Sequence, residues 1–198
     1  MFVGQLDQRI EILDYILKNG KHVWNKKKAI WSYVEQDQKI NIFSGYAKAG
    51  TTTLFVVREQ EIGMCNVILY QGKYYLITGL KKLDRMYAQA QTAKLPVYDC
   101  QYTRYNPNNI ILDKYNRPTN TNPTVIRFQG MLAEKYLGSQ TETPQTVSEI
   151  GYILLTPKVI QLEQNDVVTI SEEDYVIKLC HLLDEYKNEY EIVSRKDV

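Results

Sequence analysis

The chain has 198 residues and a formal net charge of +1, and 44% of its residues are hydrophobic and 24% charged. This composition is typical of a folded globular protein and excludes a disordered chain, while the balanced charge gives no footprint of a nucleic-acid or membrane surface. Sixteen tyrosines against four phenylalanines favour half-buried sheet faces and protein contacts, because tyrosine offers both an apolar ring and a hydroxyl.

The two halves of the chain carry opposite charge. Residues 1–104 contain 15 Lys and Arg against 9 Asp and Glu, a net +6, whereas residues 105–198 contain 9 against 14, a net −5. This pattern suits head-to-tail stacking, or a basic face near DNA with an acidic face toward a partner. Chance asymmetry between two solvated surfaces is the open alternative.

The cysteines and the N-terminal segment bear on the compartment. Cys65, Cys100 and Cys180 are odd in number and lack CxxC spacing, which predicts buried, reduced thiols in a cytosolic product. The N-terminal segment has no apolar signal core, and no run approaches the roughly 18 apolar residues of a membrane span. We therefore expect a protein that stays soluble in the cell that makes it.

The N-terminal part predicts strands joined by turns. Ile10 and Ile12 alternate with charged residues as in a strand, and Asn19-Gly20 marks a turn. A further strand is predicted from about Ala29 to Glu35, with a helix as the alternative.

The segment Gln36–Gly50 combines glycines and small polar residues with several apolar side chains. The former are typical of a long loop, but the latter are unusual in a loop that meets only water. Such loops are usually functional or fold against a partner. Another strand of the same sheet is the alternative.

Thr51–Gly79 predicts three successive strands and the core of the chain. Leu54 and Val56 fall on one face and Phe55 and Val57 on the other. Gln71-Gly72, between VILY and KYYLI, indicates a hairpin, because glycine supplies the positive φ that such turns require.

Two more strands are expected before the composition changes. One begins at about Arg85, with a short helix as the alternative, and Val97–Thr103 is expected to close the first unit.

Asn-, Pro- and Thr-rich segments then indicate a linker between about Tyr105 and Pro123. We therefore predict a β domain over residues 1–104, a linker over 105–123 and a second β domain over 124–198. The expected fold is mainly β, a small antiparallel barrel or sandwich with a second, smaller β domain. No heptads and no short tandem repeat are visible.

The motifs of well-known catalytic chemistries are absent from the sequence, including HExxH, a nucleophile elbow, a Walker loop and GxGxxG. Cys180 and His181 are adjacent on a predicted strand and point to opposite faces, so they do not share a proton. Four acidic residues bracket one short strand without calcium-loop spacing, which favours solvated hairpin ends over a cation site. They are Asp166, Glu172, Glu173 and Asp174. We therefore expect a protein that has no enzymatic activity and binds neither a cofactor nor a metal ion.

Basic residues are interleaved with aromatic ones near the N-terminus. Lys26, Lys27 and Lys28 lie between Trp24 and Trp31, a pattern found on barrels that bind single-stranded nucleic acid. A DNA-facing basic patch and an ordinary solvated loop both remain open.

Five segments occur in an order that resembles the head-tail joining, or head-closure stopper, proteins of tailed bacteriophages. They are LDQRIEIL, AIWSYVEQ, TLFVVRE, ILYQGKYYLI, and DRMY with the strand to Cys100. The resemblance covers about Leu6 to Cys100. The stretch from ILLTP to EYEI is similar to minor capsid and head-closure proteins, although Asn165-Asp166 replaces their usual Gly-Asp and their second His is missing. A second connector barrel and an unrelated appendage both remain open for this unit.

The resemblance implies a virion protein that forms a ring of identical subunits, commonly about twelve, at the neck of the particle. A portal or adaptor ring would lie on the head side and a tail terminator or tail tube on the other. Packaged DNA would occupy the channel, no membrane would be involved, and the chain would be made in the host cytoplasm. A tail terminator or adaptor ring, and a cytosolic nucleic-acid-binding barrel, remain as alternatives.

In this family the loop after the Trp-centred strand projects into the DNA channel and helps to close it. That position falls on residues 36–51 here. The implied channel residues are Lys39, Ile40, Ile42, Phe43, Gly45, Tyr46, Lys48 and Gly50.

Overall fold

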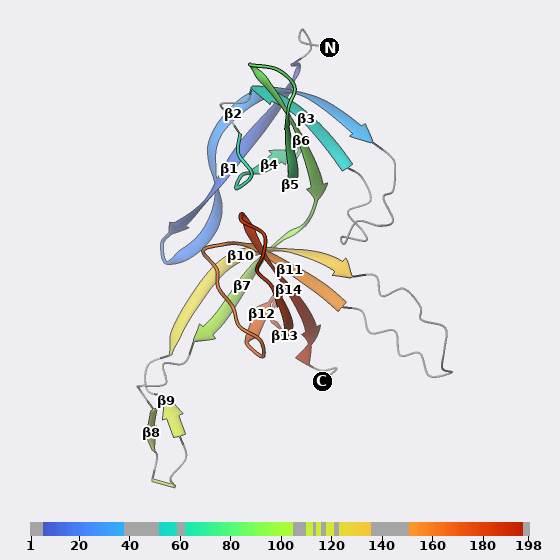
Figure 1. Cartoon of the computed structure of the whole chain (residues 1–198). Helices are drawn as coiled ribbons and strands as arrows, with labels where there is room; N and C mark the ends of the chain where they lie inside the picture. Colours follow the sequence, from blue (N-terminus) through green and yellow to red (C-terminus); the bar gives the residue numbers. More distant parts are fainter. Residues whose placement is uncertain are drawn as a thin grey trace, which may run out of the picture.

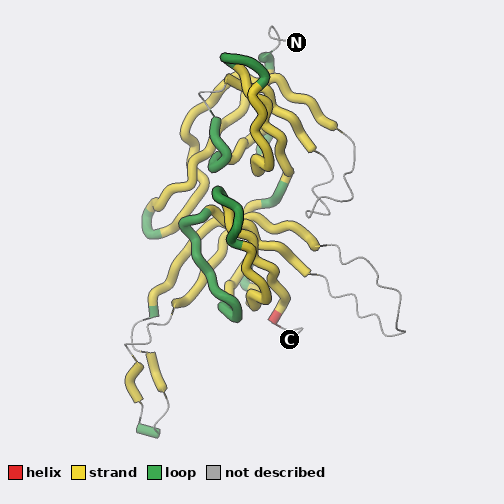
Figure 2. Tube along the Cα trace, in the orientation of Figure 1, coloured by secondary structure: helices red, strands yellow, loops and turns green. Residues whose placement is uncertain are grey.

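The computed structural model describes residues 6–37, 52–58, 62–104, 110–112, 114–115, 118–120, 123–135 and 151–195. Their regular structure is β-strand, apart from one 3₁₀ residue at Arg195 near the C-terminus, and the described residues contain no α-helix (Figure 1, Figure 2). The predicted mainly β fold, with a barrel and a second β unit, is confirmed. No helix in this part of the chain is long and apolar enough to cross a membrane.

The first six strands form a closed antiparallel barrel. Their order is β1-β4-β5-β6-β3-β2, and β2 pairs back with β1 to close it. Alternate side chains point inward, so Ile10, Phe55 and Ile77 are buried in its core. The strands are β1 (Gln8–Lys18), β2 (Lys21–Asp37), β3 (Thr52–Arg58), β4 (Val67–Tyr70), β5 (Lys73–Lys82) and β6 (Tyr87–Lys94).

Six further strands close a second antiparallel barrel below the first in Figure 1. Their order is β10-β11-β14-β13-β12-β7, with β7 pairing back to β10. Phe128, Leu154 and Tyr190 are fully buried in its core. The strands are β7 (Val97–Arg104), β10 (Thr124–Lys135), β11 (Gly151–Pro157), β12 (Val167–Ile170), β13 (Glu173–His181) and β14 (Lys187–Ser194).

The boundary between the barrels differs from the expected one. The strand expected to close the first unit, β7, pairs with β10 and β12 and therefore belongs to the second barrel. Residues 105–123 are not a linker between domains but the connection between β7 and β10. Two short strands in this connection, β8 (Ile110–Leu112) and β9 (Pro118–Asn120), pair with each other. The polypeptide passes between barrels at Leu95-Pro96.

The two barrels have the same topology. The pairings β1–β2, β2–β3, β3–β6, β5–β6, β4–β5 and β1–β4 recur as β7–β10, β10–β11, β11–β14, β13–β14, β12–β13 and β7–β12. Residues 66–94 align with residues 166–194 without a gap, and 5 of these 29 positions are identical. The chain is therefore a tandem repeat of one barrel, with a repeat too long and too diverged to be seen as a short motif.

Local details of the repeat are also shared. Asp84 accepts hydrogen bonds from the backbone N–H groups of Met86 (2.7 Å) and Tyr87 (2.9 Å). Asp184 accepts the equivalent bonds from Tyr186 (2.7 Å) and Lys187 (3.1 Å). The register shifts that separate the two ends of β5 and of β13 also fall at equivalent positions.

Several local predictions are confirmed. The residues from Tyr87 onward form strand β6, not a helix, and Gln71-Gly72 joins β4 to β5. Asn19-Gly20 joins β1 to β2 with positive φ at both residues. The three lysines at 26–28, expected in a loop, instead lie within β2, which begins at Lys21.

Candidate functional site

The predicted channel loop lies outside the described residues. This applies to Lys39, Ile40, Ile42, Phe43, Gly45, Tyr46, Lys48 and Gly50. The structure does fix what the segment connects, since it follows β2 and precedes β3. The equivalent connection in the second barrel, residues 136–150, runs from β10 to β11. The chain thus has two long connections at one topological position.

The basic stretch at 26–28 is partly neutralised by acidic residues of β1. Lys26 Nζ contacts the Glu11 carboxylate, and Lys27 Nζ lies 3.1 Å from Asp14 Oδ2. Lys28 is also engaged in an interaction. Exposed pairs of this kind contribute little to stability, but they reduce the positive charge available to a phosphate backbone.

The two barrels share an apolar interface. Outward-facing Val67, Leu76 and Ala93 of the first barrel pack in one buried cluster with Met131 and Leu155 of the second. These positions carry apolar residues on the outer face because a neighbouring barrel covers them. Their burial joins the two units into one body.

A long hairpin arm, formed by the ends of β1 and β2, reaches from the first barrel onto the second. The Tyr15 hydroxyl donates to Gln129 O (2.7 Å), and Trp24 N donates to Gln129 Oε1 (3.0 Å). Burial against the second barrel raises the pKa of the Tyr15 hydroxyl. Lys21 Nζ lies 2.7 Å from Asp99 Oδ2, and this hydrogen bond lowers the pKa of that carboxyl.

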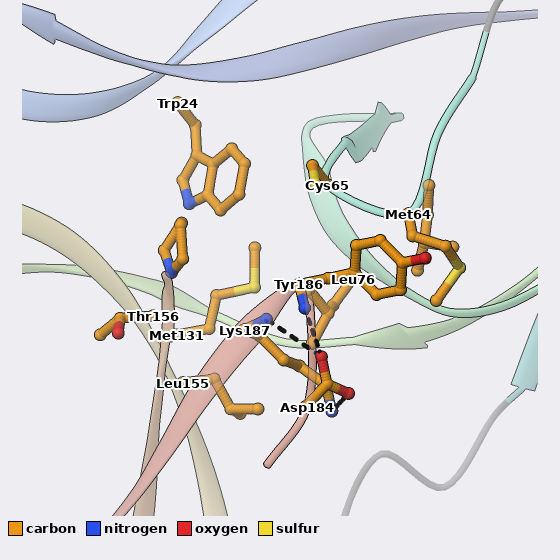
Figure 3. A pocket seen from close by; sticks show the side chains of 12 residues that line it. Trp24, Met64, Cys65, Leu76, Met131, Leu155, Thr156, Asp184, Tyr186 and Lys187 are labelled. Carbon is orange, nitrogen blue, oxygen red and sulfur yellow. Dashed lines mark hydrogen bonds and ion pairs between the residues drawn. The ribbon is translucent and has the colours of Figure 1, made fainter. Parts of the chain in front are cut away.

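A small cavity lies between the barrels (Figure 3). Trp24, Met64, Cys65, Met131 and Asp184 are among the residues that line it. Its volume is about 20 Å³, which is room for roughly one water molecule. Asp184 is occupied with the turn before β14 and with Lys187 Nζ, 3.8 Å away. The cavity is a packing defect at the interface, too small for a ligand or a substrate.

Cys180 and the adjacent His181 do not form a nucleophilic centre. Burial raises the pKa of Cys100 to about 12 and also raises that of Cys180. His181 Nε2 lies 3.0 Å from Glu191 Oε1 on the exposed side of β13, while Cys180 packs against the core. The adjacent pair therefore faces apart, as the strand alternation predicted. Cys65, expected to be buried, is exposed.

The acidic residues around β12 serve the local structure. Asp166 accepts a hydrogen bond from Glu163 N (2.7 Å), Asp174 accepts one from the Thr169 hydroxyl (2.8 Å), and Glu173 accepts one from the Tyr175 hydroxyl (3.0 Å). Among the described residues, no group of three or more His, Cys, Asp or Glu side chains is placed to hold a metal ion.

The sequence carried an overlooked signal for the inter-barrel interface. Strands β3 (TTLFVVR) and β11 (GYILLTP) are apolar at consecutive positions, not only at alternate ones. A strand of this kind is covered on both faces. In β11 the outer face, with Ile153 and Leu155, is buried by the first barrel.

Comparison with known proteins adds no identification. No protein-family model matches the chain, and no curated protein is significantly similar to it.

Proposed function

We propose that the chain is a structural subunit of the head-tail connector of a tailed bacteriophage, where it forms a ring that closes the DNA-filled head and joins it to the tail. Five segments between Leu6 and Cys100, in the order typical of the family, support this proposal. The first barrel supports it as well, because all of these segments contribute to it except the strand to Cys100, β7, which belongs to the second barrel. The segments LDQRIEIL, AIWSYVEQ and TLFVVRE supply β1, β2 and β3, and ILYQGKYYLI supplies the β4–β5 hairpin.

One observation carries the proposal furthest. Two closed barrels of one topology are joined by a buried apolar face, and each has a long connection at the same topological position. A repeated, rigid unit of this kind suits a wall built from many copies. The loop after β2, with Ile40, Ile42 and Phe43, is then the element that would reach the channel.

The partners follow from this role. Other copies of the chain would complete the ring, a portal or adaptor ring would contact the head side, and a tail terminator or tail tube would contact the other. Packaged DNA would pass through the channel. The proposed role requires no catalysis and no cofactor.

The pairing of Lys26 with Glu11 and of Lys27 with Asp14 argues against a cytosolic DNA-binding barrel. A direct check is the binding of purified protein to single-stranded DNA at low salt. Salt-sensitive binding that is lost when all three lysines at 26–28 are changed to alanine would favour this alternative.

The connector proposal is tested by deleting residues 45–50 in the phage genome that encodes the chain. We expect capsids that fill with DNA but then lose it or fail to join tails, measured as nuclease-protected DNA per particle and as tailed particles by electron microscopy. A matched deletion of residues 140–145 in the second connection is the control, and it should retain DNA. Normal virions from the first deletion would refute the channel-loop assignment.

A further inference from the structure

The internal interface joins two different faces of the repeated barrel. The first barrel contributes the outer face of β4, β5 and β6, with Val67, Leu76 and Ala93. The second barrel contributes the outer face of β10 and β11, with Met131 and Leu155. Because both barrels have the same topology, each also possesses the face that the other one uses.

The second barrel repeats the β4–β5–β6 face on β12, β13 and β14. Val67, Leu76 and Ala93 correspond to Val167, Val176 and Val193 at a constant offset of 100 residues. The three valines lie side by side, since Val176 pairs with Val167 on one side and with Val193 on the other. They remain partly exposed, whereas Val67 and Leu76 are buried by the second barrel. We call this set the valine face.

The first barrel repeats the β10–β11 face on β2 and β3. Val56 pairs with Gln89 and Leu155 with Glu189, so Val56 corresponds to Leu155. Tyr33 pairs with Val56 as Met131 pairs with Leu155, so Tyr33 corresponds to Met131. Counted by two residues along the same strands, Leu54 corresponds to Ile153 and Trp31 to Gln129. Tyr33, Leu54 and Val56 are partly exposed, and Trp31 is 54% exposed. We call these four residues the aromatic face.

The hairpin arms repeat as well. The arm of β1 and β2 reaches the second barrel, where Lys21 and His22 pair with Arg127 and Phe128 of β10. The β8–β9 hairpin lies in the equivalent connection of the second barrel, between β7 and β10. It extends away from the second barrel on the side opposite the first barrel (Figure 1).

We propose that a second copy of this chain docks head to tail, with the valine face of one copy on the aromatic face of the next. This contact would repeat the one that the chain makes internally. Contacts between two different faces propagate, and they close into a ring when the rotation per step allows it. Charge favours the contact, because it brings the first barrel of one copy against the second barrel of another. Residues 1–94 carry 14 Lys and Arg against 8 Asp and Glu, a net +6, and residues 95–198 carry 10 against 15, a net −5. The inference rests on the repeated interface and stands whether or not the protein belongs to a phage neck.

The first test is the association of the purified full chain, measured by sedimentation velocity over a concentration series up to about 100 µM, a range that reveals even weak interfaces. We expect the wild type to associate. Leu54→Asp in the aromatic face and Val176→Asp in the valine face should each weaken association by roughly tenfold or more, because each places a charge in an apolar contact. Lys81→Glu, at an exposed position outside both faces, is the matched control and should associate as the wild type does.

Mixing the two variants distinguishes a head-to-tail contact from a symmetric one. The Leu54→Asp copy retains an intact valine face and the Val176→Asp copy an intact aromatic face, so the mixture should form a one-to-one dimer and nothing larger. Circular dichroism and thermal unfolding confirm that both variants are folded. A monomeric wild type at every concentration, variants that associate normally, or a mixture of folded variants without a dimer would overturn the proposal.

Discussion

Tyr190 is the largest fully buried side chain among the described residues. Its hydroxyl forms hydrogen bonds with the backbone of the segment between β11 and β12. The hydroxyl donates to Ile160 O (3.0 Å) and accepts from Leu162 N (3.1 Å). The Asn188 side chain also donates to Ile160 O (2.8 Å). In the segment between β11 and β12, the buried Ile160 carbonyl and Leu162 N–H thus bond with side chains of β14.

We predict that Tyr190→Phe lowers the free energy of unfolding by about 1–3 kcal/mol, because the buried Leu162 N–H loses its acceptor. Tyr186→Phe is the control, since Tyr186 is 40% exposed, and it should change stability by less than about 0.5 kcal/mol. Urea unfolding followed by circular dichroism measures both. Equal effects of the two substitutions would show that the Tyr190 hydroxyl bonds contribute nothing.

The three thiols should differ sharply in reactivity. Burial raises the pKa of Cys100 to about 12 and also raises the pKa of Cys180, so both thiols hold their protons at pH 8, whereas Cys65 is exposed. We predict that a disulfide reagent such as dithionitrobenzoate labels Cys65 first and Cys100 only on unfolding. At pH 9 Cys100 should still remain unlabelled in the native protein. Loss of the fast phase in Cys65→Ser confirms the assignment, and rapid labelling of Cys100 in native protein contradicts it.

At the scale of elements, the equivalent β4–β5 and β12–β13 hairpins have the same turn conformation with different residues. Gln71 and Gly72 have φ values of 49° and 72°, and Ser171 and Glu172 have values of 50° and 73°. Both turns therefore place two residues in the left-handed region, where glycine has no steric penalty. A Cβ added at Gly72 meets no atom within 4 Å, so only backbone preference distinguishes the two turns.

Exchanging these residues gives a paired prediction. Glu172→Gly should raise the free energy of unfolding by about 1 kcal/mol, and Gly72→Glu should lower it by a similar amount, because a left-handed non-glycine residue costs about 1–2 kcal/mol. Thermal or urea unfolding of the two variants beside the wild type measures both shifts. Shifts of the same sign in the two variants would be inconsistent with a purely conformational origin.

The strands were predictable from sequence, but their partners were not. Period-2 alternation is local, which is why Leu54–Val57 and the β4–β5 hairpin were recognised. Barrel closure depends on pairings between distant residues, so β7 was assigned to the unit that precedes it in the chain, although it pairs with β10 and β12. The repeat was hidden because its halves keep shape and register, not residue identity, as Ala90 and Tyr190 illustrate at equivalent core positions. The outer faces of β3 and β11 were visible as apolar residues, but only the pairing reveals which face a neighbour covers.

At the scale of the whole molecule, the inter-barrel face determines whether the two barrels behave as one body. Leu155 is 3% exposed within this face, while its equivalent, Val56, lies on the aromatic face of the first barrel and is partly exposed. The two positions have the same place in the barrel and differ in whether a second barrel covers them. They therefore isolate the contribution of the interface from that of the barrel itself.

We predict that Leu155→Ala lowers the free energy of unfolding by about 2–4 kcal/mol, because it leaves a void in a buried apolar contact that few atoms can refill. Val56→Ala, in dilute protein where copies do not associate, should cost less than about 1 kcal/mol.

Trp24 lies at the interface, in the cluster that contains Leu155, so its fluorescence should report loss of the contact in Leu155→Ala. Far-ultraviolet circular dichroism follows the strands of both barrels at once. If the contact joins them into one cooperative unit, the two signals coincide in the wild type and separate in Leu155→Ala. Transitions that already separate in the wild type, or equal costs at the two positions, would mean that the barrels are stable independently of the face they share.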